Sequence, residues 1–121
     1  MILVDTSVWV DHLKKQEPRL VEHLMANKVL MHSSIIGELA CGNLVNRAER
    51  LRDWHALPPI SELQNGDVVA LIDGRKLMGR GIGLVDAHIL GAVLNHSGAL
   101  LWTRDKRLRG IAEEIGVAFS E

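Results

Sequence analysis

Short apolar runs alternate with longer amphipathic segments along this chain of 121 residues. The runs at 2–4, 29–31 and 99–102 have the length and composition of strands that are buried on both faces. Residues 117–119 form a similar run near the end of the chain, and Ile60 lies in a further short candidate strand. Because helical segments separate these runs, the pattern favours right-handed crossovers between parallel strands. We therefore expect an α/β fold, a three-layer α/β/α sandwich with a short parallel sheet of four or five strands.

Apolar residues recur at three- and four-residue intervals between the runs, which predicts helices that pack by one face. Hydroxyl side chains precede two of these helices, so we expect Thr6 or Ser7 to cap the first and Ser33 or Ser34 to cap the one after the second strand. Gly116 marks the end of the last helix. The predicted helices span residues 8–15, 18–26, 35–42, 46–55, 65–78, 84–96 and 108–115.

The segment at 84–96 is apolar almost all round and rich in small residues. A helix with so little polar surface is covered by its neighbours, so we expect it to lie centrally in the fold. Its acidic residue, Asp86, falls in the first turn, where the helix dipole favours a negative charge.

Composition is that of an ordinary globular domain, which we assign to residues 1–121. Hydrophobic residues make up 47% of the chain and mean hydropathy is +0.10, which indicates a chain that buries a core. No apolar run approaches the ~20 residues of a membrane-spanning helix, and the start of the chain does not resemble a signal peptide. We expect a cytoplasmic protein without membrane contact. Cys41 is the only cysteine, and its place in an apolar helix favours a small hydrophobe over a catalytic nucleophile.

Net charge gives no general indication of a nucleic-acid partner, because 14 Lys and Arg oppose 15 Asp and Glu. Basic residues nevertheless gather at 47–52, 75–80 and 104–109. Such clusters either follow a phosphate backbone or form solvated helix faces, and the residues alone leave both interpretations open.

Four of the fifteen acidic residues fall where a predicted strand ends or a predicted helix opens: Asp5, Glu38, Asp86 and Asp105. The carboxyl ends of parallel strands meet at one edge of a sheet, so these side chains are expected to converge there. A carboxylate in a buried position costs free energy unless it is paired, hydrogen-bonded or bound to a cation. Asp5 and Asp105 could instead cap helices, whereas Glu38 and Asp86 lie among apolar neighbours.

Carboxylates crowded together raise one another's pKa, and they stay ionised mainly around a divalent cation. An all-oxygen ligand set suits Mg²⁺ or Mn²⁺ better than Zn²⁺. We therefore expect Asp5 to lie within metal-bridging distance of Glu38, Asp86 and Asp105. Cations of this kind activate water and stabilise a leaving oxygen in the hydrolysis of phosphate esters.

The motifs around these carboxylates resemble the PIN domain, and the compact length is similar to that of the VapC toxins of toxin-antitoxin modules. The resemblance spans essentially the whole chain. The motifs that carry it are D-T-S after the first strand, G-E-L, V-D-A-H-I-L-G-A and T-R-D-K-R-L. It implies a Mg²⁺- or Mn²⁺-dependent endoribonuclease. The residues carried over as its catalytic and metal-binding cluster are Asp5, Glu38, Asp86 and Asp105.

The resemblance also implies supporting residues and partners. Thr6 and Thr103 are expected to give polar support beside the cluster. Arg80, Arg104 and His88 are possible contacts to the RNA substrate. A VapB-like antitoxin is the expected protein partner, and homodimers are usual in the family.

Other classes fit the residues less well. A phosphatase of the haloacid dehalogenase type has a second Asp two residues after its nucleophile, where this chain has Ser7. The remaining alternative is a non-catalytic PIN-like module that binds RNA or protein, although such a module would not need four acidic positions. His88 and Gly91 depart from the residues more common in the PIN-domain helix, which bears on helix packing and substrate contacts rather than on the carboxylates.

Overall fold

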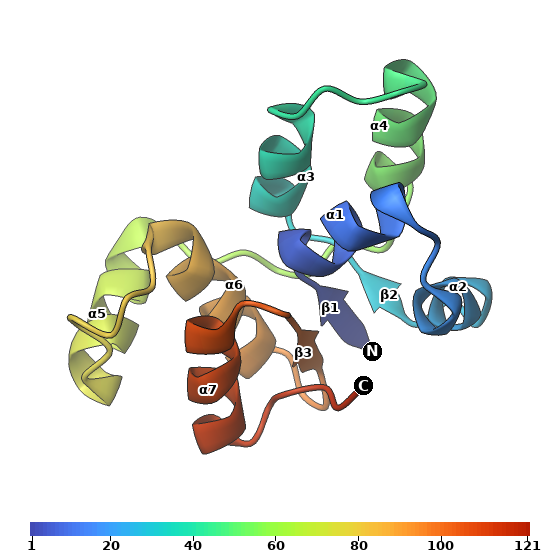
Figure 1. The fold of residues 1–121 in the computed structure, drawn as a ribbon. Coiled ribbons are helices and arrows are strands. Elements are labelled where there is room, and N and C mark those ends of the chain that lie inside the picture. Colours follow the sequence, from blue (N-terminus) through green and yellow to red (C-terminus); the bar gives the residue numbers. More distant parts are fainter.

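Three short parallel strands form the centre of the fold in the computed structural model, which describes residues 1–121 (Figure 1). They are β1 (Ile2–Val4), β2 (Val29–Leu30) and β3 (Leu100–Trp102), in the spatial order β2-β1-β3. β1 pairs with both other strands, and all three of its residues are buried. An apolar strand without alternation therefore becomes the central strand, as expected where helices cover both faces.

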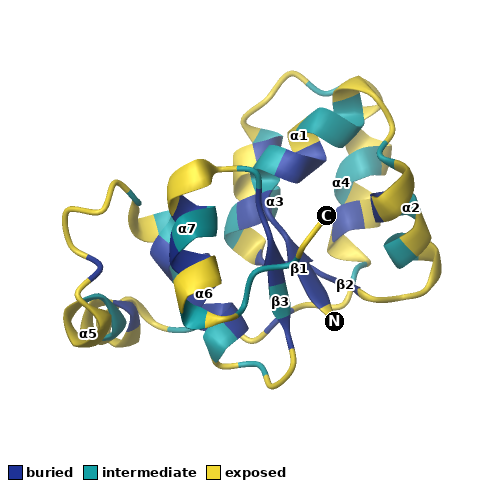
Figure 2. Ribbon diagram, turned by 60° about the horizontal axis from the view of Figure 1, so that its bottom comes forward, coloured by how far each residue is buried: buried dark blue, intermediate teal, exposed yellow.

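Helices lie on both sides of this sheet. They are α1 (Thr6–Lys14), α2 (Pro18–Met25), α3 (Ser33–Ala40), α4 (Arg47–His55), α5 (Asn65–Arg75), α6 (Leu84–Leu94) and α7 (Lys106–Ile115). Figures 1 and 2 show α6 and α7 on one side of the strands and α1, α2 and α4 on the other. This is the predicted three-layer α/β/α arrangement. None of the helices is long and apolar enough to span a membrane.

The sheet has fewer strands than the four or five predicted. The two remaining candidate runs each make a single parallel bridge, Pro59 with Met31 and Ala118 with Leu101. Proline has no N–H to donate to a ladder, so pairing at Pro59 does not extend into a strand. The Ala118 segment adds one hydrogen bond on either side of Leu101 and then leaves the sheet.

α6 is the central helix of the core, as its composition predicts. Ala87 and residues 89–93 are buried, and Gly91 allows α5 and its preceding loop to approach closely. A Cβ on Gly91 would lie 2.8 Å from Leu63 Cδ1 and 3.2 Å from Leu71 Cδ2. The glycine at this position therefore serves helix packing.

Two helix caps differ from the predicted hydroxyl caps. Asp5 caps α1 in place of Thr6 or Ser7, and its carboxylate accepts the Ser7 N–H at 3.5 Å. His32 caps α3, with Nδ1 accepting the Ser34 N–H at 3.1 Å. In both places the residue that ends the preceding extended segment already has the backbone conformation that an N-cap residue needs.

The single cysteine lies just outside the apolar helix in which the sequence places it. Cys41 follows α3 as its C-cap residue and is exposed. Helix α3 ends one residue earlier, so the apolar face that buries Ile35 and Leu39 does not extend to this position.

Candidate active site

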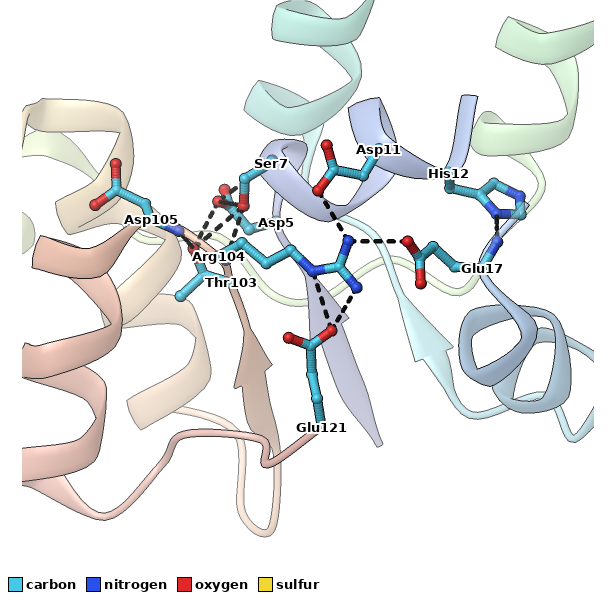
Figure 3. A network of polar contacts seen from close by, with 9 residues as sticks. All are labelled: Asp5, Ser7, Asp11, His12, Glu17, Thr103, Arg104, Asp105 and Glu121. Carbon is cyan, nitrogen blue, oxygen red and sulfur yellow. Dashed lines mark hydrogen bonds and ion pairs between the residues drawn. The ribbon is translucent and has the colours of Figure 1, made fainter. Parts of the chain in front are cut away.

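The carboxyl ends of β1 and β3 lie side by side and are followed at once by polar residues (Figure 3). The Asp5 N–H donates to the Trp102 carbonyl at 2.9 Å, which continues the parallel pairing to the end of both strands. Residue 5 is thereby placed next to residues 103–105, almost a hundred positions along the chain.

Asp5 is held by two hydroxyl groups and is only 5% exposed. The Ser7 and Thr103 hydroxyls both donate to Oδ2 of Asp5, each at 2.8 Å. Each hydroxyl also accepts a backbone N–H, from Arg104 at 3.0 Å and from Asp105 at 3.1 Å respectively. Because these N–H groups occupy the acceptor side of the hydroxyls, the hydroxyl protons are directed at Asp5. The hydrogen bonds gather on Oδ2, which leaves Oδ1 available to a ligand.

The other three predicted carboxylates come from helices. Glu38 is an exposed residue of α3, and the Thr6 hydroxyl donates to its Oε1 at 2.6 Å. Asp86 is half-buried in the first turn of α6. Asp105 caps α7, where Oδ1 accepts two backbone N–H groups of the first turn, both at 3.0 Å. Thr6 and Thr103 thus each donate to one of the predicted carboxylates.

The four carboxylates lie close enough to influence one another electrostatically. Burial raises the pKa of Asp86 most, and the charges of Asp5, Asp105 and Glu38 raise this pKa further. A hydrogen bond from the Gly83 N–H acts in the opposite direction. Like charges raise a pKa in this way only at short range, so the fold brings the four groups into one region, which we call the acidic site.

The oxygen-only donor set of the acidic site suits a hard divalent cation. No three acidic, histidine or cysteine side chains lie close enough to hold one ion together in this conformation. Glu38 is bound to Thr6, and Asp105 is bound to its own helix and points away from Asp5 in Figure 3. The side chains therefore do not form the closed ligand set that the sequence predicts, although their chemistry fits such an ion.

Arg104, a candidate RNA contact, is bound by three carboxylates instead (Figure 3). Its guanidinium lies 2.8 Å from Asp11 and 3.0 Å from Glu17, and Nε donates to Glu121 at 3.0 Å. Hydrogen bonding to Arg104 lowers the pKa of Glu17 and Glu121, and these partners in turn raise the pKa of Arg104. We call these four residues the Arg104 cluster.

The other two candidate RNA contacts also have partners within the protein. Arg80 forms a bidentate pair with Glu114, at 2.8 and 2.7 Å. His88 Nε2 lies 2.6 Å from Oδ1 of Asn65, and its ring meets that of His32 edge to face at 6.3 Å between centroids. The acidic site therefore has no free cation among the three residues that the sequence suggested for RNA.

Ser7 is a site residue that the sequence suggested only as a helix cap. It joins Asp5 to the backbone of Arg104, and so it links the two strand ends. The D-T-S spacing held the signal, because a serine in the opening turn of a helix can reach back to the residue two positions before it. Asp11, Glu17 and Glu121 gave no such signal, because their common partner is distant in sequence.

Known proteins are similar to this chain in sequence and in fold. The family described as the PIN domain matches residues 2–114. The chain belongs to the PIN-domain family. Two relatives are each 44% identical to this chain over 124 residues, and the match covers 100% of this chain and 98% of the relative. Both are called Ribonuclease VapC32, and they come from the CDC 1551 / Oshkosh and H37Rv strains of Mycobacterium tuberculosis. This full-length identity makes the chain a PIN domain of the VapC type.

A solved structure supports the fold of this PIN domain. The crystal structure of PAE2754 from Pyrobaculum aerophilum superposes with a TM-score of 0.65, over 98% of this chain and 87% of that chain. Sequence identity is only 18%, so the likeness concerns the architecture. The three-stranded sheet and its flanking helices are thus a PIN-like α/β fold.

Proposed function

We propose that this VapC-type PIN domain is a Mg²⁺- or Mn²⁺-dependent endoribonuclease and the toxin of a VapBC-type toxin-antitoxin pair. The observation that carries the proposal is the gathering of four carboxylates without a cationic partner. Asp5 and Asp105 follow the paired ends of β1 and β3, and the charges of Asp5, Asp105 and Glu38 all act on Asp86. Crowded like charges destabilise a fold, and a divalent cation is the ligand that relieves them. Relatives named as ribonucleases support RNA as the substrate.

Within this proposal, the four carboxylates of the acidic site hold the cation, with Asp5 and Asp86 as the more buried members. When bound, such a cation lowers the pKa of water and stabilises negative charge on the oxygens of the phosphodiester. Ser7 and Thr103 hold the Asp5 carboxylate in a fixed orientation and leave Oδ1 open. Thr6 orients Glu38 at the exposed side of the site.

The direct test is cleavage of RNA by the purified protein. We expect cleavage with Mg²⁺ or Mn²⁺, none with a chelator, and none from the Asp86→Asn variant. Asp73→Asn is the matched control, because Asp73 is an exposed aspartate of α5 with no ion pair or side-chain hydrogen bond. Cleavage that Asp86→Asn does not alter would contradict the proposal. RNA binding without cleavage under all of these conditions would favour the non-catalytic PIN-like module.

The RNA that is cut can be identified in cells. Sequencing of RNA ends after induction of the protein should reveal new ends that are absent after induction of Asp86→Asn. The positions of these ends would distinguish transfer, ribosomal and messenger RNA as the substrate class.

A VapB-like antitoxin is the proposed protein partner. Glu38 and Asp105 are exposed carboxylates, so a basic side chain of the partner would complement the acidic site and compete there with metal or substrate. Co-purification from a strain that carries the neighbouring gene tests the partnership. Unchanged affinity for an Asp5→Ala, Glu38→Ala double variant would argue against insertion into the site. We also propose a homodimer, which light scattering can check.

A further inference from the structure

Three arginines, from the loop before α6, the end of β3 and helix α7, are neutralised by carboxylates of the protein. Arg104 binds three of them, Arg80 binds Glu114, and Arg109 binds a glutamate of α7 at 2.9 Å. Arg107 differs from these. It is exposed at the start of α7, and its guanidinium forms no hydrogen bond or ion pair.

Although it has no charged partner, the Arg107 side chain has a defined place against Gly81. A Cβ on Gly81 would lie 2.6 Å from Cδ of Arg107 and 2.9 Å from both Nε and Nη1. A side chain at residue 81 would therefore require the end of the Arg107 side chain to move, and the positive φ of Gly81, +85°, also favours glycine. The guanidinium group of Arg107 therefore packs against the backbone of Gly81 in the loop before α6.

Both segments that place Arg107 lead directly into the acidic site. The Arg107 N–H donates to the Asp105 carboxylate at 3.0 Å. Gly81 lies two residues before Gly83, the N-cap of α6, whose backbone N–H lowers the pKa of Asp86. A free guanidinium is thus held by the same two segments that carry Asp86 and Asp105.

We propose that Arg107, which packs against Gly81, binds a phosphate group of the RNA backbone next to the acidic site. A guanidinium offers two parallel N–H donors to a phosphate, and here no carboxylate has to be displaced first. A side chain that is already in place also loses less conformational entropy when it binds. This inference rests on the proposed function, because it takes RNA as the substrate, and it names a residue that positions that substrate.

Binding can be separated from cleavage by working in the Asp86→Asn background with a short fluorescent single-stranded RNA of mixed sequence. We expect Arg107→Ala to weaken binding about tenfold, the typical effect of losing one charged hydrogen-bonding contact. The slope of log affinity against log salt should also become shallower by about 0.7, as for one lost phosphate contact on a single strand. Arg109→Ala is the matched control, because it removes the same charge from the same helix at a side chain that is already paired.

Two further variants separate the position of Arg107 from its charge. Arg107→Lys keeps the charge but loses the two-donor geometry, so we expect it to bind RNA less tightly than the parent and more tightly than Arg107→Ala. Gly81→Ala should weaken binding because it displaces the guanidinium, and the Gly81→Ala, Arg107→Ala double variant should bind no more weakly than Arg107→Ala alone. Melting temperatures show that each variant is folded.

The outcomes distinguish this inference from the proposed function. If the wild-type protein cleaves RNA but Arg107→Ala and Arg109→Ala bind it equally well, the role of Arg107 is overturned and the ribonuclease activity stands. If RNA binding depends on Arg107 but the wild-type protein never cleaves, the inference stands and the activity fails. Absence of RNA binding by both the Asp86→Asn protein and the wild type would overturn the role of Arg107, and absence of cleavage by the wild type would separately overturn the activity.

Discussion

Two groups of carboxylates lie at the same edge of the sheet, and the protein balances their charge in opposite ways. In the Arg104 cluster, one guanidinium binds three carboxylates and lowers the pKa of Glu17 and Glu121. In the acidic site, no cationic side chain forms an ion pair with any of the four carboxylates, and the pKa of Asp86 is raised. The first group is satisfied within the fold, whereas the carboxylates of the second have no cationic partner there.

The two groups are nevertheless joined through one short path. The N–H of Arg104 donates to the Ser7 hydroxyl, which donates to Asp5. The guanidinium of the same residue fixes α1, the start of α2 and Glu121. The Arg104 cluster thus supports the turn that carries Asp5. The difference between the two groups can be tested by substitutions in either one.

The largest expected effect is on catalysis, from removing one charge of the acidic site. Asp5→Asn keeps the size of the side chain and an oxygen that Ser7 and Thr103 can reach, but it loses the charge that would bind the proposed cation. We expect kcat/KM for RNA cleavage to fall at least about 100-fold, with little change in melting temperature. Activity within a few-fold of the wild type would mean that the two groups do not differ in function.

Substitution in the Arg104 cluster is expected to lower the stability of the protein. Arg104→Met leaves Asp11, Glu17 and Glu121 without their shared cation. We expect the melting temperature at pH 7 to fall by about 4 °C, at the upper end for a partly exposed ion-pair network. Calorimetry of both proteins measures this shift, and an unchanged melting temperature would show that the cluster is not stabilising.

Asp86→Asn should act on stability with the opposite sign. The pKa of Asp86 is raised in the folded state, so its stabilising contribution is present at low pH and is lost as the pH rises through that pKa. At pH 7 without metal, we therefore expect Asp86→Asn to melt about 2 °C higher than the wild type. Millimolar Mg²⁺ should raise the melting temperature of the wild type and not that of the variant. A lower melting temperature for Asp86→Asn than for the wild type would contradict the view that the charges of the acidic site destabilise the fold.

The smallest expected effect is the pH dependence of the Arg104 cluster. Glu17 and Glu121 have lowered pKa values in the folded state, so their contribution is present above the usual value of 4.5 and is lost as the pH falls through the folded values. The stability difference between the wild type and Arg104→Met should therefore shrink below about pH 4. Urea unfolding at a series of pH values measures this stability difference. A difference that stays constant down to pH 3 would show that it does not arise from the lowered pKa values of Glu17 and Glu121.

Features that depend on local pattern could be predicted from the sequence. The apolar runs gave the three strands, and the strand-end rule brought residues 5 and 105 to one edge although a hundred positions separate them. The central place of α6 followed from its composition. These features depend on burial, which hydrophobic periodicity reports directly.

Features that depend on competition between nearby groups could not be predicted in this way. His32 displaced the expected serine cap, and Asp5, which the sequence offered only as an alternative cap, displaced Thr6 and Ser7, because backbone conformation at the strand end decided the cap. The partners of Arg104 come from three separate segments, and no local pattern marks them. The orientation of each carboxylate in the acidic site likewise depends on which neighbouring donor it meets.

The position of Cys41 has a practical consequence. It is the only thiol of the chain, it is exposed, and it lies three residues after Glu38, about one helical turn away. A maleimide dye or a nitroxide attached there would label the molecule at one position only. Its fluorescence or spin relaxation would then test the proposed binding of Mn²⁺, a paramagnetic ion, without any change to the carboxylates themselves.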